Sequence, residues 1–526
     1  MPRRLLPLFL AAACAALALP PAAPAADWPE FFGGDARNPV SNERGLPTQF
    51  IPGTIHLDND TNAAALKTSN LKWRVKLSTH AYSGPVIAGG KIFLGTSNTE
   101  KGGLVLALDE ATGRELWRLY IPRFRTDLPL YNYDNLDLGV CSTPTVEGNR
   151  LYLVSNRDEV LCLDTEGQAN GNDGPFQDEA KFVVESNQPP AADLAKIGDI
   201  VWRFDMLTEK NVEAWVQDAS SCSVIVRGNY VYVNPSNGVD KSHKNVPRPH
   251  APSIIVLDKR TGKLVARDYE EVGTRLFHGE WSSPSMGVVG SRRWLGGLGG
   301  RELLFWGAGD GRVYAFDPQP QPPLAGQPIP RLQTVWSFDV NASGGRTGVY
   351  KTVAGPSEVT AAPVLHRDRI YAEVGQDPRH GEGRGVLACI DATKTGDVTS
   401  NGMVWVNTSI DRSLTTVAIE GKLLFTADFS GRVHCLDLDT GKTHWMYESH
   451  RPIWSSPLIA DGKVYIGTDA GDLLVFAESK EMKLLAKTKV ESPISASPVA
   501  HKGVLYLLTQ HWLFAAKEGA DARPGE

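Results

Sequence analysis

The chain has few cysteines, no strong excess of charge and, after its first segment, no long apolar run. Only 6 of its 526 residues are cysteine, and the formal net charge is −6. A net negative charge repels the phosphate backbone, so the composition excludes a basic nucleic-acid-binding module. No later stretch approaches the roughly 18 uninterrupted apolar residues of a membrane-spanning helix. Hydrophobic residues nevertheless make up 42% of the chain, enough for a substantial buried core.

The first residues have the pattern of a secretory signal peptide. Arg3 and Arg4 precede an apolar stretch over residues 5–19, and Ala23 and Ala25 supply the small residues of a cleavage site. The stretch is too short and too rich in alanine for a membrane anchor. We therefore predict a mature protein in the periplasm or outside the cell.

The cysteines do not form a disulfide framework. Cys14 follows a run of alanines, but no bulky residue precedes it at the position that lipid attachment requires, so a lipoprotein is not predicted. The later cysteines are scattered, without an adjacent pair or a Cys-x-x-Cys. Cys162, Cys389 and Cys435 occupy the same place in similar strand patterns that end in aspartate. We interpret them as small buried hydrophobic residues.

A repeated unit organises the rest of the chain. It starts with a step of small residues, often followed by proline, and continues with two alternating strands, the second ending in Leu-Asp or a close variant. A Thr-Gly turn and a strand with tryptophan complete it. Copies are recognisable around residues 104–117, 254–265, 313–336 and 423–445, and Val265 replaces the tryptophan in the second of these.

The unit predicts a four-stranded antiparallel sheet. Alternation gives each strand two covered faces, and the Asp-x-x-Thr-Gly sequence suits a tight turn in which aspartate binds the backbone and glycine adopts a positive φ. The tryptophan fills the wide outer gap between wedge-shaped sheets. Because one unit cannot bury both faces alone, the units must stack, and closing them into a ring protects their edges.

The outer strands give the number of units. The anchor residues in the main body are Trp117, Trp202, Val265, Trp336, Trp405, Trp445 and Leu485. The C-terminal repeat, residues 494–516, lacks such a strand, and the segment around Trp73 would complete it. We therefore predict an all-β fold, an eight-bladed β-propeller of four-stranded antiparallel blades closed by an N-terminal strand, with seven blades as the alternative.

The predicted organisation is a single large domain with short additions. Longer excursions at 165–200, 234–252 and 317–332 are expected as loops on the rim or on a face. The predicted boundaries are a signal peptide at 1–25, an N-terminal arm at 26–70, the propeller at 71–520 and a C-terminal tail at 521–526.

The repeat resembles that of pyrroloquinoline-quinone (PQQ)-like β-propellers. Residues 27–34, Asp-Trp-Pro-Glu-Phe-Phe-Gly-Gly, and Gly45-Leu46-Pro47 resemble the start of exported bacterial members, and the resemblance extends over most of residues 27–517. It is specific for the fold but not for an activity. The wider family includes quinone-dependent alcohol and sugar dehydrogenases, an outer-membrane assembly lipoprotein, and exported proteins without an established reaction.

The dehydrogenase branch implies a specific set of groups. These are a quinone over a tryptophan floor, a disulfide between adjacent cysteines, a Ca²⁺ ion held by Glu, Asn and Asp, and an aspartate base. No adjacent cysteines exist here, no catalytic residue of that set can be carried over, and no Cys-x-x-Cys-His indicates a haem c domain. We therefore favour a non-catalytic binding or scaffold module without a committed cofactor. A diverged dehydrogenase with PQQ and calcium is the alternative.

A ligand would bind on the funnel face, where loops lead into the inner strands. Several of these loops carry polar or aromatic residues before the small-residue step, which could hold a polar ligand or simply satisfy the tunnel mouth. The candidates are His80, Tyr82, His278, Glu280, Trp281, Glu358, Asp411, Arg412, His450, Arg451 and Trp454, with Asp218 at an equivalent place. His278 and Glu280 are too few for a metal site, so none is predicted.

The two functions make different predictions. A dehydrogenase requires Tyr82, His278, Glu280, Trp281 and Arg451 to converge around a cavity large enough for a tricyclic cofactor. A scaffold requires only a face or rim that binds a protein, peptide or glycan. Residues 131–137, rich in Tyr, Asn and Asp, could bind Ca²⁺ or a sugar, although a polar entry loop is the favoured explanation. We expect a monomer that binds no nucleic acid.

Overall fold

The computed structural model describes the chain from the N-terminal arm to the C-terminal strand, with gaps. The described residues are 27–53, 68–77, 80–97, 102–124, 126–129, 131, 133, 136, 138–179, 194–290, 299–375, 384–490 and 492–522. The predicted signal peptide, Cys14 and most of the predicted tail lie outside this range, as do several residues of 131–137. Within it, no helix has the length and apolar character needed to cross a membrane.

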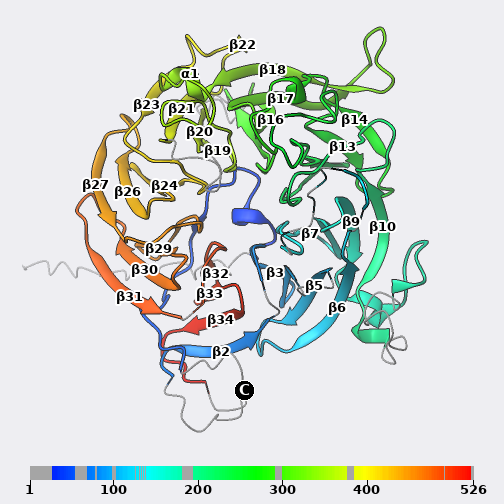
Figure 1. Cartoon of the computed structure of the whole chain (residues 1–526). Helices are drawn as coiled ribbons and strands as arrows, with labels where there is room; N and C mark the ends of the chain where they lie inside the picture. The colour runs from blue at the N-terminus through cyan, green and yellow to red at the C-terminus, as the bar shows by residue number, and fades with distance from the viewer. Residues whose placement is uncertain are drawn as a thin grey trace, which may run out of the picture.

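The fold is all-β, as predicted. Mostly four-stranded antiparallel sheets follow one another around a central axis (Figure 1). We call the strand positions in each unit A to D from the axis outward. In chain order, strands A to D of the first unit are β3 (Val86–Ala88), β4 (Lys91–Ser97), β5 (Gly102–Asp109) and β6 (Glu115–Pro122), and those of the second are β7 (Thr145–Glu147), β8 (Arg150–Val154), β9 (Glu159–Asp164) and β10 (Asp199–Asp205). Strands A to D of the third unit are β11 (Ile225–Arg227), β12 (Tyr230–Val233), β13 (Ile255–Asp258) and β14 (Leu264–Arg267). Those of the fourth are β15 (Ser285–Val289), β16 (Arg301–Gly307), β17 (Arg312–Gln321) and β18 (Arg331–Asp339).

The later units repeat this order, but the last takes its outer strand from the N-terminal part of the chain. The next unit consists of β19 (Val364–His366), β20 (Arg369–Val374), β21 (Val386–Asp391) and β23 (Met403–Asn407), and the one after it of β24 (Ala418–Glu420), β25 (Leu423–Ala427), β26 (Arg432–Asp437) and β27 (Thr443–Glu448). It is followed by the unit of β28 (Leu458–Ala460), β29 (Lys463–Gly467), β30 (Asp472–Ala477) and β31 (Leu484–Lys489). In the last unit, β32 (Val499–His501), β33 (Val504–Leu508) and β34 (Trp512–Lys517) are strands A to C, and β2 (Leu71–Lys76) is strand D. Antiparallel β2 and β34 place Trp73 opposite Ala515.

A few short elements lie outside this pattern. β1 (Val40–Ser41) runs parallel to β28, and β22 (Gly396–Asp397) runs parallel to β18. The short helices are η1 (Phe31–Gly33), η4 (Gly167–Asn170), η6 (Leu194–Lys196), η7 (Val272–Thr274) and α1 (Val340–Ser343). The excursion predicted at 317–332 is only partly a loop, because β17 continues to Gln321 and β18 starts at Arg331. A register shift between Asp317 and Gln321 accommodates the prolines between them.

The turn after the Leu-Asp strand has the predicted geometry. In the first unit, Asp109 Oδ1 accepts hydrogen bonds from the Thr112 backbone N–H (2.9 Å) and Oγ1 (2.7 Å), and Gly113 has φ +74°. The same bonds recur at Asp258 and at Asp437. A Cβ on Gly113 would lie 2.8 Å from the Trp73 ring, so glycine is required for packing as well as for φ.

The tryptophans pack between neighbouring units. Trp202, on strand D of one unit, donates its indole N–H to the Lys259 carbonyl in the turn of the next unit (2.9 Å). The same bond is made by Trp73, Trp117, Trp336, Trp405 and Trp445. Where Val265 replaces tryptophan, Tyr232 donates to the Pro318 carbonyl instead (3.0 Å), and β14 pairs with β18 to merge two units into one sheet.

Candidate binding cavity

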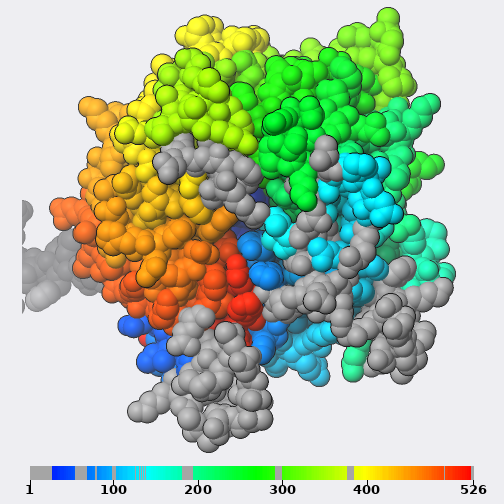
Figure 2. Space-filling view, in the orientation of Figure 1, coloured from blue at the N-terminus to red at the C-terminus, as the bar shows by residue number. Residues whose placement is uncertain are grey.

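A cavity of about 450 Å³ lies on the central axis. Its wall consists of the small-residue steps before the A strands, some of the turns between B and C strands, and part of the N-terminal arm. A depression is visible near the centre of the face shown in Figure 2. The volume is in the range of small-molecule sites.

The small-residue steps form a ring around this cavity. Its positions are Gly84, Thr143, Ser223, Ser283, Ala362, Thr416, Ser456 and Ser497, all of which line the cavity. Their hydroxyls accept hydrogen bonds from the backbone N–H of the preceding unit: Gly84 to Thr143 (2.7 Å), Thr143 to Ser223 (3.0 Å), Ser223 to Ser283 (2.9 Å), Thr416 to Ser456 (2.9 Å) and Ser456 to Ser497 (2.9 Å). We call the accepting residues, Thr143, Ser223, Ser283, Ser456 and Ser497, the hydroxyl belt.

In several units, the residue before the ring position accepts a different hydrogen bond. Ser83 Oγ accepts from the Gly95 N–H (3.1 Å) within its own unit, and Ser142 accepts from Val154 (3.1 Å) in the same way. In another unit this place is held by Cys222, whose sulfur accepts from the Asn234 N–H (3.3 Å). The paired small residues therefore satisfy backbone donors both within and between units, which explains why the sequence repeats them.

The N-terminal arm closes one part of the cavity. Trp28, Phe31 and Phe32 contribute to the lining, and Figure 1 shows η1 near the centre of the ring of sheets. The arm is bound to successive A strands, with backbone hydrogen bonds from Trp28 to Ile87 and from Val146 to Pro29. The sequence predicted a packed arm but gave no indication that its aromatic side chains would lie on the axis.

Arg37 fixes the arm in this position. Its side chain is fully buried. The guanidinium donates to the carbonyl of Pro284 (2.9 Å), and to the Val224 carbonyl (3.0 Å) in the neighbouring unit. It also binds within the arm, to the Phe31 carbonyl (2.9 Å) and the Glu30 carboxylate (3.1 Å). One side chain thus links the arm to two units.

Four predicted site residues line the cavity, namely Asp218 and three aromatic residues. Tyr82, Trp281 and Trp454 all contribute to its lining. The Trp281 indole donates to the Gln217 carbonyl (3.2 Å), and the Trp454 ring meets Phe429 edge to face at 5.2 Å. The charged residues of the described lining are Asp218 and Asp469. Burial raises the pKa of Asp469 above its ordinary value.

His278 and Glu280 lie beneath this wall and do not contribute to the described lining. Both are fully buried. His278 Nε2 lies 2.7 Å from Gln217 Nε2 and 3.1 Å from His243 Nδ1. Glu280 accepts from Ser253 Oγ at 2.8 Å, and burial raises its pKa well above the ordinary value. These contacts hold the loop in place.

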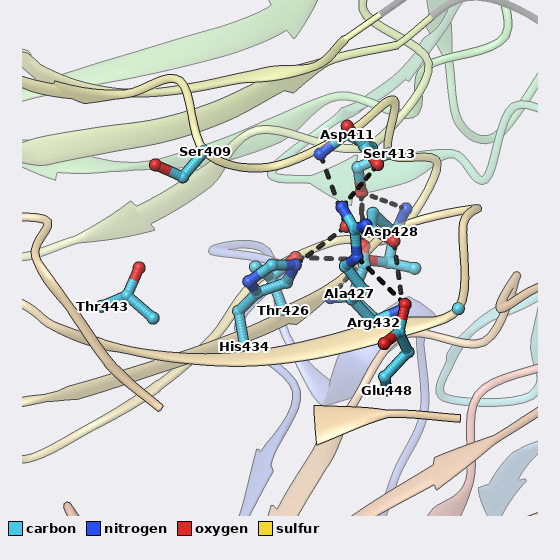
Figure 3. Close-up of polar contacts among 12 residues, drawn as sticks. Ser409, Asp411, Ser413, Thr426, Ala427, Asp428, Arg432, His434, Thr443 and Glu448 are labelled. Carbon is cyan, nitrogen blue, oxygen red and sulfur yellow. Dashed lines mark hydrogen bonds and ion pairs between the residues drawn. The ribbon is translucent and has the colours of Figure 1, made fainter. Parts of the chain in front are cut away.

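Asp411 belongs to a polar cluster that also contains Arg432 and Glu448 (Figure 3), and Arg412 is the next residue of the chain. Asp411 accepts from Arg432 at 2.7 Å, and Arg432 also lies 3.7 Å from Glu448. Arg412 lies over the Phe429 ring, 4.9 Å from its centroid. These residues are therefore already engaged in protein contacts.

A buried contact between a histidine and an aspartate lies deeper in the same cluster. His434 Nε2 is 2.9 Å from Asp428 Oδ2, and both side chains are almost completely buried. The Asp428 Oδ1 accepts from the backbone N–H of Arg432 (3.0 Å). Asp428 directly precedes the cavity-lining Phe429, so the pair holds that turn.

The remaining predicted residues also lie outside the described lining. His80 is partly buried and lies parallel to Tyr82, with ring centroids 6.4 Å apart. Glu358 is fully buried, whereas His450 and Arg451 are exposed. A dehydrogenase would require five of the predicted residues to converge around the cavity. Of these, Tyr82 and Trp281 line it, whereas His278, Glu280 and Arg451 do not belong to the described lining.

Sequence reasoning missed the contribution of the B–C turns. Phe429, Asp469 and Gln510 reach the cavity from turns between B and C strands. These turns lie on the same side of each unit as the loops before the A strands, because strands A and B form a hairpin. The sequence signal that could have identified these turns is a glycine two residues after the lining position, Gly431 after Phe429 and Gly471 after Asp469.

The described lining does not fit the quinone of the dehydrogenases. Tryptophans are present as a floor would require, but PQQ carries several carboxylates, and the charged groups facing it would be the carboxylates of Asp218 and Asp469. No lysine, arginine or histidine belongs to the lining among the described residues. Nor do those residues include a cluster of three or more His, Cys, Asp or Glu that could hold a metal ion. The described cysteines are free thiols.

The repeat and its arrangement define the class, a PQQ-like β-propeller repeat protein. Within that class, the chain belongs to the family described as "Outer membrane protein assembly factor BamB", whose profile matches residues 59–269, 334–447 and 383–485, together more than half of the chain. BamB of Moranella endobia (strain PCIT) is 26% identical over 170 residues, which are 32% of this chain and 38% of that protein. The aligned part thus spans well under half of that relative.

Solved structures with different functions share the fold. BamB from Moraxella catarrhalis superposes with a TM-score of 0.53 at 12% identity, covering 85% of this chain and 98% of that chain. A europium-containing methanol dehydrogenase gives 0.55 at 12% identity, with 92% and 90% covered. The quinohemoprotein alcohol dehydrogenase ADHIIG from Pseudomonas putida HK5 gives 0.54 at 12% identity, with 94% and 81% covered. At such identities the likeness concerns the fold alone.

Proposed function

We propose that this chain is a non-catalytic scaffold of the bacterial cell envelope that takes part in outer-membrane protein assembly. It would bind a protein partner through the face formed by the loops between strand D of one unit and strand A of the next, the D–A loops. The family profile and the name of the Moranella relative support this assignment. A periplasmic location after removal of residues 1–25 belongs to the same proposal.

The proposal includes a complete ring. We propose eight blades over residues 71–520, with β2 as the outer strand of the last blade and residues 26–70 as an arm. The hydrogen-bonded register of β2 with β34 supports it, as does the Trp73 indole bonded to Glu110 in the first unit. Such closure protects the sheet edges and gives a rigid platform.

The observation that carries the proposed function is the exposed apolar surface of two D–A loops. Leu128, between β6 and β7, is 55% exposed, and Val349 and Val353, between β18 and β19, are 74% and 53% exposed. Exposed large apolar side chains gain free energy when a protein partner covers them, so these loops are the positions at which we expect a partner to bind. Both loops lead into A strands, so they lie on the cavity side of the ring.

Site-specific photocrosslinking in cells tests this surface. A photoreactive residue at Leu128, Val349 or Val353 should give an adduct with a protein of outer-membrane assembly, identified by mass spectrometry. Leu324 and Met446 are matched controls, because they are 57% and 47% exposed but lie on the β17–β18 hairpin and on outer strand β27. Those positions should give no such adduct.

Two results would contradict the proposal. One is adduct formation at Leu324 and Met446 with none at the D–A positions. The other is a saturable, calcium-dependent rise of the unfolding temperature with PQQ, since a ligand that binds only the native state stabilises it further as the ligand concentration rises. That second result would favour the dehydrogenase alternative, and alcohols and sugars should then be screened.

A further inference from the structure

We propose that the central cavity binds an organic cation, an ammonium or guanidinium group on a short apolar stem. The cation could be a free amine or the side chain of a basic peptide, which share this chemistry. The proposal concerns the interior of the cavity and does not depend on the protein partner proposed above.

The charges of the cavity favour a cation. Asp218 and Asp469 are the charged residues among the described lining residues. Within the described part of the chain, the Asp469 carboxylate makes no hydrogen bond or ion pair, and its surroundings contribute only burial. A partly desolvated carboxylate without a partner is costly, and a cation is the group that relieves this cost.

The hydroxyl belt supplies no positive charge that would attract an anion. Its hydroxyls already accept hydrogen bonds from backbone N–H groups, such as those of Thr143, Ser223 and Ser456. Those N–H groups are thereby occupied, so the donors that the belt keeps for a ligand are its own O–H groups, which carry no charge. The charged groups on the described cavity wall are aspartates, and their negative charge favours a cation over an anion.

The aromatic rings suit the same ligand. Tyr82, Trp281 and Trp454 line the cavity, and tryptophan is the best partner for a cation over a ring face. Arg412 already lies over the Phe429 ring at 4.9 Å, so we assign the ligand contact to the other three rings. Trp28, Phe31 and Phe32 of the arm provide an apolar surface for the stem.

Isothermal titration calorimetry on the mature protein tests the proposal with paired probes. Choline is compared with 3,3-dimethyl-1-butanol, its neutral isostere, and the methylamides of N-acetyl-lysine and N-acetyl-arginine are compared with that of N-acetyl-norleucine. We expect saturable binding of cations in at least one pair and none of the neutral partner. The pair that binds distinguishes a free amine from a basic side chain.

Asparagine variants identify the groups responsible. D469N should weaken the bound cation by at least about tenfold, because a charge-assisted contact is replaced by a neutral one. D218N should act in the same direction, and the backbone should tolerate it because asparagine, like aspartate, adopts the φ of +60° found there. D439N alters an aspartate outside this cavity and should leave the affinity unchanged. Unfolding temperatures confirm that each variant is folded.

Several results would overturn the proposal. These are equal binding of a cation and its neutral isostere, unchanged affinity in both D469N and D218N, or no heat with any cation up to about 10 mM, where even very weak sites are filled. Since the probes are small and the protein is purified, these outcomes are independent of the crosslinking result.

Discussion

The indole N–H of Trp73 donates to the backbone carbonyl of Glu110 at 3.2 Å, although the two residues belong to different sheets. Trp73 lies on β2, the outer strand of the last unit, and Glu110 follows β5 of the first unit. The same indole-to-carbonyl bond joins other consecutive units, for example Trp405 to Leu438 at 3.0 Å. The bond therefore links the outer strand of one unit to the C–D turn of the next unit.

Removing this bond should weaken the ring measurably. We expect W405F to lower the free energy of unfolding by about 1–2 kcal/mol, because the buried Leu438 carbonyl loses its donor, and W405A to lower it by about 3–5 kcal/mol. The control is W215F, because the buried Trp215 N–H has no hydrogen-bond partner among the described residues. Urea unfolding provides the measurement. Equal losses in W405F and W215F would show that the ring volume, and not the bond, matters.

The fold could be predicted well because the repeat carries it locally. The Asp-x-x-Thr-Gly turn and the alternating strands each determine a short-range geometry, and the structure has the predicted bonds at Asp109, Asp258 and Asp437. The proline-rich excursion was predicted less well. Prolines usually end strands, but here a register shift lets β17 continue through them to Gln321.

The cavity could be predicted only in part, because its wall comes from segments far apart in the chain. The small-residue steps indicated where the loops converge, and Tyr82, Trp281 and Trp454 do line the cavity. Sequence cannot show whether a polar side chain turns toward the axis or into its own unit. Glu280 turns into its unit and binds Ser253, whereas Asp469, whose carboxylate has no hydrogen-bond partner among the described residues, lines the cavity.

The hydroxyl belt makes a prediction about the small-residue steps. We expect S223A to lower the free energy of unfolding by about 1–3 kcal/mol, since the Thr143 N–H would lose its acceptor. S223T keeps the acceptor, and its extra methyl can project into the cavity that Ser223 lines, so it should retain most of the stability. Thermal unfolding of the three proteins checks the order. If S223T lost as much stability as S223A, the size of the side chain at position 223, and not its hydroxyl acceptor, would determine stability.

The buried Arg37 predicts that the arm depends on one guanidinium. We expect R37K to lower the free energy of unfolding by about 3–5 kcal/mol. The single ammonium group of lysine cannot replace the guanidinium that donates to both the Pro284 and the Val224 carbonyls, so the arm loses part of its hydrogen bonding to the sheets. Limited proteolysis should then cleave the arm before the sheets. R301K is the control, since Arg301 is 47% exposed and its pair with Asp317 should contribute less than about 1 kcal/mol. Resistance of the R37K arm to protease would contradict this role.

The buried Glu373 predicts that stability depends on pH. Glu373 Oε1 accepts from Thr426 Oγ1 at 2.6 Å, and burial raises its pKa from the ordinary 4.5 to about 8. The nearby Asp428 acts in the same direction, while Ser413 and Thr426 oppose it. Between these pH values the folded state holds a proton that the unfolded state releases. The stability present below pH 4.5 is therefore lost as the pH rises toward about 8.

The variant E373Q isolates this effect from other buried carboxylates. Its amide stays neutral, so its stability relative to the parent should increase by on the order of 2–4 kcal/mol between pH 5 and 8 and then level off. Urea unfolding at several pH values gives the difference. E481Q, at an exposed position, should follow the parent curve throughout. If E373Q also ran parallel to the parent, Glu373 would be ionised in the folded state, and the network around Thr426 and Asp428 would have to stabilise that charge.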